Sequence, residues 1–166
     1  MATYVHNDLD ITTPAQTSDS SPLAITGYPA PTYPAWKAFN HILGPGEEWL
    51  VVSVTAGWLK VDLGAGAAKA ISAYTVSRGY YADRAPKDWT LQGSNNDTDW
   101  TTVNTQTAQT AWGADEMRTY TLGSISDGWR YWKLNITAND GGLHLEVGEL
   151  ELLGVAAGGR NNAMIF

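Results

Sequence analysis

Hydrophobic and polar residues alternate along several short stretches of the chain, which is the pattern of strands with one buried face. Leu59, Val61 and Leu63 fall on one side of such a stretch, and the residues between them are charged. This stretch ends an alternating segment over 49–63, and turn-forming residues separate it from further strands expected at 70–77, 89–93, 100–105, 118–122, 131–137 and 143–153. Short strands are also expected at 8–12 and 23–27. No apolar repeat of helical period runs through the sequence. About eight strands with turns between them predict an all-β sandwich or jelly roll.

The chain is expected to form one domain with a distinct segment at each end. A chain of 166 residues buries roughly two thirds of its unfolded surface, which is enough for one hydrophobic core. Residues 1–35 are rich in proline and are expected to hold an N-terminal arm and the first strands. The sandwich itself is expected over 36–154. Residues 155–166 are expected to form either a loose tail or an apolar plug that docks on another subunit.

Charge and composition narrow the classes of function. The net charge is -7 and the 10 Lys and Arg are scattered, whereas nucleic-acid-binding proteins carry a basic face for the phosphates. Without cysteine, the chain forms no disulfide, thiolate metal site or cysteine nucleophile. No run of 18 apolar residues is present, so no membrane insertion is expected. Trp and Tyr number 8 each against 2 Phe, and both suit binding surfaces as well as cores.

Four sequence elements, in order between Trp36 and Gly154, resemble the discoidin or coagulation-factor C-type family of galactose-binding-like domains. They are Ala38-Phe39-Asn40-His41 followed by Trp49, then the stretches Trp58 to Gly64, Pro86 to Trp100 and Gly128 to Leu134. The resemblance implies a galactose-binding-like β-sandwich (jelly roll), similar to carbohydrate-binding modules, and a binder in place of a catalyst. The same fold carries binders of sugars, lipids and proteins, so it does not name the ligand.

The loop that follows the strand at 70–77 is the first candidate binding site. In sugar-binding members of the family, loops at one end of the sandwich form the site. Guanidinium and carboxylate groups exchange hydrogen bonds with hydroxyls, and tyrosine rings stack on the apolar face of a sugar. The candidate ligand-binding residues of this loop are Arg78, Tyr80, Tyr81, Asp83 and Arg84. The alternative interpretation is a solvated loop with an Arg–Asp ion pair.

Three residues outside this loop are further candidates for ligand binding. Trp112 lies in a polar loop without strand alternation, where it is either a binding residue or a lid over the core. Asn139 begins an Asn-Asp-Gly-Gly turn, which either contacts a ligand or is a plain hairpin turn. His41 is expected to join the same rim as Arg78 or to be an ordinary loop residue. The tryptophans at strand positions are expected to be structural: Trp58, Trp89, Trp100 and Trp132.

Many family members hold a calcium ion, and the resemblance implies Asn40 and Glu149 as the positions that would bind it here. Asn40 lacks the charge of the aspartate in the family pattern. Calcium takes about six to eight oxygen ligands, usually with several carboxylates, so Glu47 or Glu48 would have to compensate. The alternative is that Asn40 caps a turn and Glu149 accepts a structural hydrogen bond.

No arrangement of residues typical of an enzyme is found in the sequence. A Gly-x-Ser-x-Gly elbow and a phosphate-binding loop are absent, and the 3 histidines lack metal-binding spacing. Two glutamate pairs, Glu47 with Glu48 and Glu146 with Glu149, resemble glycosidase carboxylates only superficially. Members of each pair are separated by an odd number of positions, so in a strand they point to opposite faces. We therefore expect no catalytic activity.

Two hypotheses about function follow, and both place the protein on a surface where it binds a cell-surface glycan. The first is a phage virion accessory protein, of the capsid decoration or tail-fibre type, displayed on the virion surface and adhering to host glycans. It is based on the lack of a Sec signal, the lack of cysteine and the arm-like ends, which are expected to contact other virion subunits in an oligomer or assembly. The alternative is a carbohydrate-binding module excised from a secreted, extracellular glycoside hydrolase or adhesin.

Overall fold

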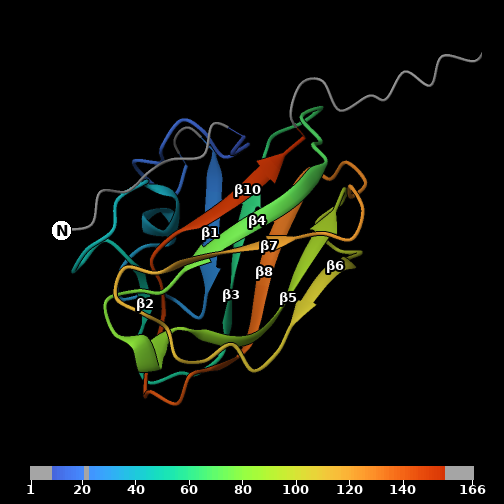
Figure 1. Cartoon of the computed structure of the whole chain (residues 1–166). Coiled ribbons are helices and arrows are strands. Elements are labelled where there is room, and N and C mark those ends of the chain that lie inside the picture. The colour runs from blue at the N-terminus through green and yellow to red at the C-terminus, as the bar shows by residue number, and fades with distance from the viewer. Residues whose placement is uncertain (1–8, 21–22, 156–166) are drawn as a thin grey trace, which may run out of the picture.

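The computed structural model describes residues 9–20 and 23–155, and these form two facing antiparallel layers. The larger sheet has the order β1-β3-β8-β5-β6, with strands Ala24–Tyr28, Gly57–Asp62, Tyr131–Asn139, Pro86–Ser94 and Thr101–Gln106. The smaller sheet, β10-β4-β7, contains Leu150–Gly154, Ile71–Ser77 and Met117–Thr121. In Figure 1 the smaller sheet lies in front of the larger one. A short pair of strands and two 3₁₀ turns complete these elements: β2 (Trp49–Val51), β9 (Leu145–Val147), η1 (Ala35–Phe39) and η2 (Ala82–Arg84).

The expected all-β fold is confirmed, and one expected strand divides into two. The stretch 143–153 forms β9 and β10, which belong to different sheets. The division falls at Gly148, where the backbone passes so close to β4 that a Cβ would collide with the carbonyl oxygen of Arg78. The Gly148 N–H donates to the Ser77 carbonyl (3.1 Å), and the Ser77 N–H donates to the Glu149 carbonyl (2.8 Å). This pairing marks the point where the chain leaves the β2–β9 pair and joins the smaller sheet.

The core lies between the two sheets and is built around large aromatic side chains. Trp49, Trp89 and Trp132 are at most 1 % exposed. The alternation seen in the sequence is confirmed, because Leu59 and Val61 are buried in the same cluster. The smaller sheet contributes Tyr74, Ile71 and Leu152 from the opposite side. Strand positions that alternate in polarity thus bury one face and leave the other to solvent.

A hydrogen-bonded link between aromatic residues crosses the core. The indole N–H of Trp89 on β5 donates to the hydroxyl of Tyr74 on β4 (3.0 Å), which donates to Asn104 Oδ1 on β6 (2.8 Å). Tyr120 stacks on Tyr74 with ring centroids 5.1 Å apart. Because buried polar groups cost free energy unless they are hydrogen-bonded, this link is what lets a tyrosine and an indole N–H occupy the core.

The N-terminal segment pairs with the last strand of the sandwich. The Ile11 N–H donates to the Leu152 carbonyl (2.8 Å), and the Gly154 N–H donates to the Leu9 carbonyl (2.8 Å). The paired N-terminal residues and β1 both lie within residues 1–35, where the N-terminal arm and the first strands were expected. The rest of the expected arm (1–8) and nearly all of the expected tail (156–166) lie outside the described residues.

We predict that Tyr74→Phe destabilises the fold more than Tyr120→Phe. Loss of the Tyr74 hydroxyl leaves the buried Trp89 N–H without its acceptor, which costs about 1–3 kcal/mol of unfolding free energy. The Tyr120 hydroxyl, which donates to Gln109 Oε1 (3.1 Å), is only half-buried and serves as the matched control. Urea unfolding of both variants measures the difference, and equal losses would contradict a special role for the Tyr74 link.

Candidate functional site

Glu146 holds the 78–84 loop in place at one end of the sandwich. Its carboxylate is completely buried, and it accepts the backbone N–H of Tyr81 at Oε2 (3.0 Å) and a guanidinium N–H of Arg84 at Oε1 (2.6 Å). Gly79 lies against the same side chain, where an added Cβ would be 2.7 Å from Oε2. The guanidinium carbon of Arg84 is 3.9 Å from the centre of the Tyr81 ring. The loop is thus attached to β9 and is not a freely solvated segment.

The loop displays two tyrosine rings to solvent. Tyr80 is 51 % exposed and Tyr81 is 48 % exposed, and the rings meet edge to face with centroids 4.8 Å apart. The Arg78 guanidinium donates to the Tyr80 carbonyl (2.7 Å). In Figure 1 the η2 turn lies at the lower end of the sandwich, near the β8–β9 connection, to which it is joined by the Gly142 N–H donating to the Asp83 carbonyl (2.7 Å).

Acidic and basic groups are mixed at this end of the molecule. Glu48 is 4 % exposed and accepts the Gly46 N–H (2.9 Å). Burial raises the pKa of the Glu48 carboxyl, and the nearby charge of Glu146 raises it further. The expected Arg–Asp ion pair within the loop is replaced by the pair of Arg84 with Glu146, which is 62 positions away in the chain. Such a surface offers donors, acceptors and exposed rings, which suits a ligand that is both polar and ring-shaped.

The structure does not present Trp112 as a binding residue. Its side chain is only 5 % exposed, its indole N–H donates to the carbonyls of Pro86 and Gln109 (both 3.2 Å), and the Arg118 guanidinium lies 4.0 Å from the ring centre. Trp112 therefore covers the core, which was the alternative interpretation of this residue. Its polar neighbours in the sequence do not indicate this burial, and one of its partners, Pro86, is 26 positions away in the chain.

Asn139 and His41 are likewise engaged in structural contacts. Asn139 is 4 % exposed, and its amide donates to the carbonyls of Gly142 (2.8 Å) and His144 (2.6 Å), so it shapes the turn as the hairpin interpretation expected. His41 Nε2 lies 3.2 Å from Asp10 Oδ2, which holds the ring against the N-terminal segment.

Asn40 and Glu149, the positions implied for calcium, meet at the backbone N–H of Ile42. This N–H donates to Asn40 Oδ1 (2.8 Å) and to Glu149 Oε1 (3.1 Å), and the Asn40 amide donates to Glu47 Oε2 (2.9 Å). Glu149 Oε2 is buried without a hydrogen-bond partner, which suits a cation ligand. The Asn40 oxygen, in contrast, is already engaged.

The side chains at this position do not complete a calcium shell by themselves. Within 9–20 and 23–155, no group of three or more His, Asp or Glu is arranged to hold a metal ion. Burial raises the pKa of Glu149 well above its usual value, and the charges of Glu151 and Asp10 add to this effect. The open Glu149 oxygen would supply one of the six to eight or so ligands that calcium takes, so backbone carbonyls and water would have to supply most of the others.

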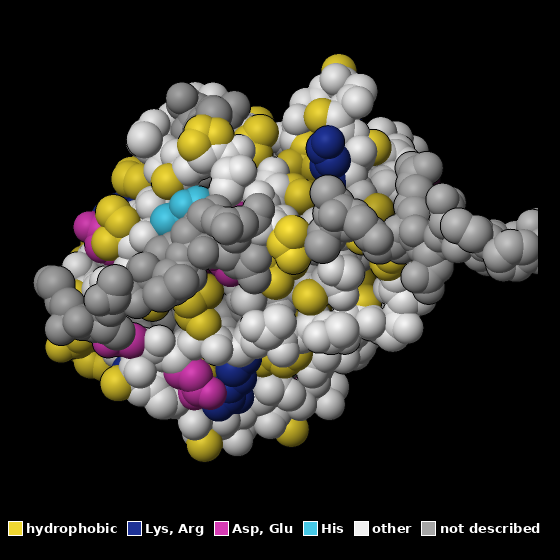
Figure 2. Space-filling model, turned by 45° about the horizontal axis from the view of Figure 1, so that its top comes forward, with side chains coloured by type: hydrophobic (Ala, Val, Ile, Leu, Met, Phe, Trp, Pro, Cys, Tyr) yellow, Lys and Arg dark blue, Asp and Glu magenta, His cyan; other side chains and the backbone are white. Residues whose placement is uncertain are grey.

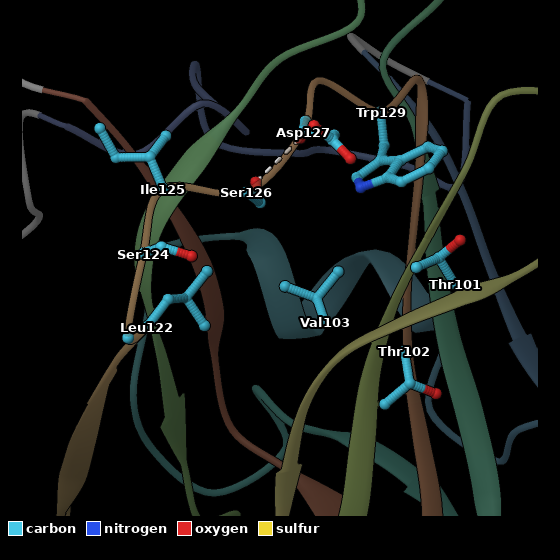
Figure 3. A pocket seen from close by; sticks show the side chains of 10 residues that line it. Thr101, Thr102, Val103, Leu122, Ser124, Ile125, Ser126, Asp127 and Trp129 are labelled. Carbon is cyan, nitrogen blue, oxygen red and sulfur yellow. Dashed lines mark hydrogen bonds between the residues drawn. The ribbon is translucent and has the colours of Figure 1, made fainter.

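A hollow lies between β6 and the β7–β8 connection, at the end of β4 that is opposite the 78–84 loop. Its volume is about 370 Å³. Figure 3 shows Thr101, Thr102 and Trp129 on one side and Ser124 and Ile125 on the other. Its walls are hydroxyl groups and apolar surface. No motif in the sequence pointed to this hollow, because residues 122–127 form an irregular connection without a recognisable pattern.

Figure 2 shows few Lys and Arg side chains on the described part of the face it presents, and they do not form a continuous basic surface. Among the residues that the structure describes, no helix is long and apolar enough to span a membrane.

Comparison with solved structures defines the class of fold as a galactose-binding-like β-sandwich. Chitosan-binding module 1 from a chitosanase/glucanase of Paenibacillus sp. IK-5 is 21% identical, with a TM-score of 0.63 over 87% of this chain and 98% of that one. The family 32 module of NanJ from C. perfringens, solved with galactose, is 19% identical, with a TM-score of 0.58 over 77% and 92%. The family 32 module of EndoD from Streptococcus pneumoniae is 13% identical, with a TM-score of 0.62 over 79% and 96%.

These neighbours are carbohydrate-binding modules, which are galactose-binding-like domains, so the fold implied by the sequence resemblance is confirmed. No family model and no curated protein matches the chain. The similarity is therefore one of fold.

We predict that Glu149→Gln changes how stability depends on pH. The folded-state pKa of Glu149 is raised, so the folded protein holds this proton more tightly than the unfolded chain does. The contribution of Glu149 to stability therefore improves as the pH falls from neutral towards about 4.3, the ordinary value for glutamate. Urea unfolding should show that the unfolding free energy of wild type increases relative to that of the variant as the pH falls from 8 to 5.

Glu116→Gln is the matched control for this measurement. Its hydrogen bond with Arg118 lowers the pKa of Glu116, so its stabilising contribution is present throughout pH 5–8 and is lost only below that range. The difference in unfolding free energy between Glu116→Gln and wild type should therefore stay constant over this pH range. A constant difference for Glu149→Gln as well would refute the raised pKa.

Proposed function

We propose that this chain is a non-catalytic carbohydrate-binding module that binds a cell-surface glycan at the end of the sandwich formed by the 78–84 loop. The observation that carries the proposal is the exposed pair Tyr80 and Tyr81, held by a buried Glu146 on a fold shared with carbohydrate-binding modules. The sugar-binding residues are Arg78, Tyr80, Tyr81, Asp83 and Arg84. Trp112, Asn139 and His41 are not part of the proposed site, because their side chains are buried or engaged.

Each residue of the proposed site has a distinct role. The tyrosine rings supply apolar faces for a pyranose ring. A guanidinium carries five N–H donors, so Arg78 retains donors for sugar hydroxyls beyond its hydrogen bond to the Tyr80 carbonyl. The Asp83 side chain is exposed and can accept hydroxyl hydrogens. Arg84 and Glu146 keep the loop in shape.

The geometry supports binding without catalysis. Glu146 is completely buried, and both of its carboxylate oxygens bind the loop. A hydrolytic pair needs two carboxyl groups that reach the scissile bond. The depression lined by Glu48, Arg78 and Tyr80 is also small, at about 10 Å³. We therefore expect a dissociation constant in the micromolar to millimolar range, about -8 to -4 kcal/mol.

The site is tested by a glycan array followed by titration of the best ligand with variants. We expect Tyr80→Ala and Tyr81→Ala each to weaken binding about tenfold, because each removes a stacking ring. Tyr33→Ala is the matched control, since Tyr33 is 37 % exposed and lies outside the loop. The proposed site is wrong if the loop variants bind as wild type does.

Calcium at Asn40 and Glu149 is a separate part of the proposal, supported by the buried Glu149 oxygen that has no hydrogen-bond partner. A bound ion would stabilise the fold by about 2.7 kcal/mol at a hundred times its dissociation constant. We expect a higher melting temperature in CaCl₂ than in EDTA or MgCl₂, and no such rise in Glu149→Gln. Equal melting temperatures of wild type in CaCl₂ and in EDTA would rule the ion out.

The similar chitosan-binding module comes from a chitosanase/glucanase, which favours a module of a carbohydrate-active protein over a virion accessory protein. The virion role and its partner subunits stay a prediction, because they depend mainly on residues 1–8 and 156–166, which lie outside the described residues.

A further inference from the structure

The outer face of the larger sheet carries exposed aromatic rings, although the sequence indicated that its strand tryptophans were structural. Tyr28 on β1 and Trp58 on β3 are register partners and stack with ring centroids 6.0 Å apart and an angle of 21° between the planes. Their neighbours Leu59 and Val61 point into the core, so these rings face outward. Tyr28 is 60 % exposed, and Trp58 is half-buried. The rings form an aromatic strip along β1 and β3.

A second indole and two lysines complete a groove on this face. Trp100 has the Lys133 ammonium 3.8 Å from its ring centre, and Lys133 on β8 is the register partner of Lys60 on β3. The Lys60 ammonium bonds to both oxygens of Asp97 (2.8 and 2.6 Å) and lies 5.6 Å from the ring of Trp58. Together the five side chains of Trp58, Lys60, Asp97, Trp100 and Lys133 enclose about 200 Å³.

Lys133 has the carboxylate of Asp97 in the same groove, but that carboxylate is bound by Lys60. Lys60 is paired with Asp97, and Arg130 on the same sheet is paired with Asp62 at 2.7 Å. Within the described part of the chain, Lys133 forms no ion pair. Burial lowers the pKa of Lys133, the charge of Asp97 raises it, and the charge of Lys60, directly opposite on the neighbouring strand, lowers it. An anion placed beside this ammonium would relieve both costs.

We propose that this groove binds a uronic acid residue of a glycan, with its carboxylate on Lys133 and its ring against Trp58. The proposal rests on the proposed function for the class of ligand and adds a second binding surface with a preference for acidic sugars. Indole faces stack on the apolar side of a sugar ring, and an ammonium binds a carboxylate as a point charge.

The size and charge of the groove favour this ligand over other anions. Pockets that enclose drug-sized ligands measure about 300–1,000 Å³, so a groove of about 200 Å³ suits one sugar ring of a chain that continues beyond it. Nucleic acids bind through many cations along their phosphates. A single unpaired ammonium matches one carboxylate per sugar far better. With the loop end, the module would then hold a glycan at two surfaces, which raises the overall affinity without new contacts.

The test is calorimetric titration of the whole chain with a short oligogalacturonate and with the same oligosaccharide after its carboxyl groups are reduced to alcohols. We expect the acidic form to bind at least about tenfold more tightly, because charged hydrogen bonds are stronger than neutral ones. Binding of the acidic form should weaken between about 0.05 and 0.5 M salt, since exposed charges are screened.

Variants then assign that binding to the groove. Lys133→Met, which keeps an unbranched stem, should lose about tenfold in affinity for the acidic form and little for the neutral form. Trp58→Ala should weaken both. Lys69→Met makes the same charge change at an exposed lysine outside the groove, and it should bind as wild type does. Melting curves should show that each variant is folded.

The outcomes separate this proposal from the proposed function. Acidic binding that survives Lys133→Met but is lost in Tyr80→Ala would overturn the groove and leave the loop site standing. Acidic binding that survives Tyr80→Ala but is lost in Lys133→Met would support the groove, whatever the loop binds. Equal binding of the acidic and reduced forms, or binding of a sulfated dextran that is as tight as that of the acidic form and is lost in Lys133→Met, would overturn the carboxylate preference.

Discussion

The hydrogen bond between Trp89 and Tyr74 is the contact on which the arrangement of the two sheets depends. Trp89 lies on β5 of the larger sheet and Tyr74 on β4 of the smaller one. The loop proposed to bind sugar is the connection between these same two strands. The spacing of the layers, about 10 Å for packed sheets, therefore sets the span that residues 78–85 must cross. The aromatic core thus positions the loop that displays Tyr80 and Tyr81.

Buried carboxylates perform a second structural task, which is to hold loops where no strand pairing is possible. Glu146 accepts the N–H of Tyr81, Glu149 that of Ile42, and Glu48 that of Gly46. Hydrogen bonds to a charged acceptor are stronger than those between neutral groups. The cost is the desolvation of acidic groups inside an already acidic protein. This cost is visible in the raised pKa values of Glu48 and Glu149.

Fold and ligand are separate questions in this protein. The sandwich is shared with modules whose known ligands include chitosan and galactose, yet the same architecture hosts unrelated binders. What distinguishes this chain is where its rings and charges are left accessible. One set lies at a sheet-to-sheet loop and another lies on the outer face of the larger sheet, so the two surfaces are supported by different elements and can vary independently.

The sequence by itself determined the strands and the exposure of the loop, whereas the tertiary structure decided which side chains meet. Alternation along residues 58–63 is a local signal, and it correctly placed Leu59 and Val61 in the core. The loop sequence likewise indicated exposed tyrosines at 80 and 81. Trp112, in contrast, is buried, and it makes contacts that no local pattern contains, such as the hydrogen bond of its indole N–H to the Pro86 carbonyl 26 positions away.

The same limit explains the partners that sequence analysis missed. Arg84 pairs with Glu146 across 62 positions, and Lys60 meets Lys133 only because β3 and β8 are neighbours in the sheet. Motif matching placed Trp58 and Trp100 with the structural tryptophans, since strand position alone does not say which face is covered. Periodicity follows from the backbone geometry of one strand. Pairing across the fold follows from sheet order and layer contact, which only the folded chain defines.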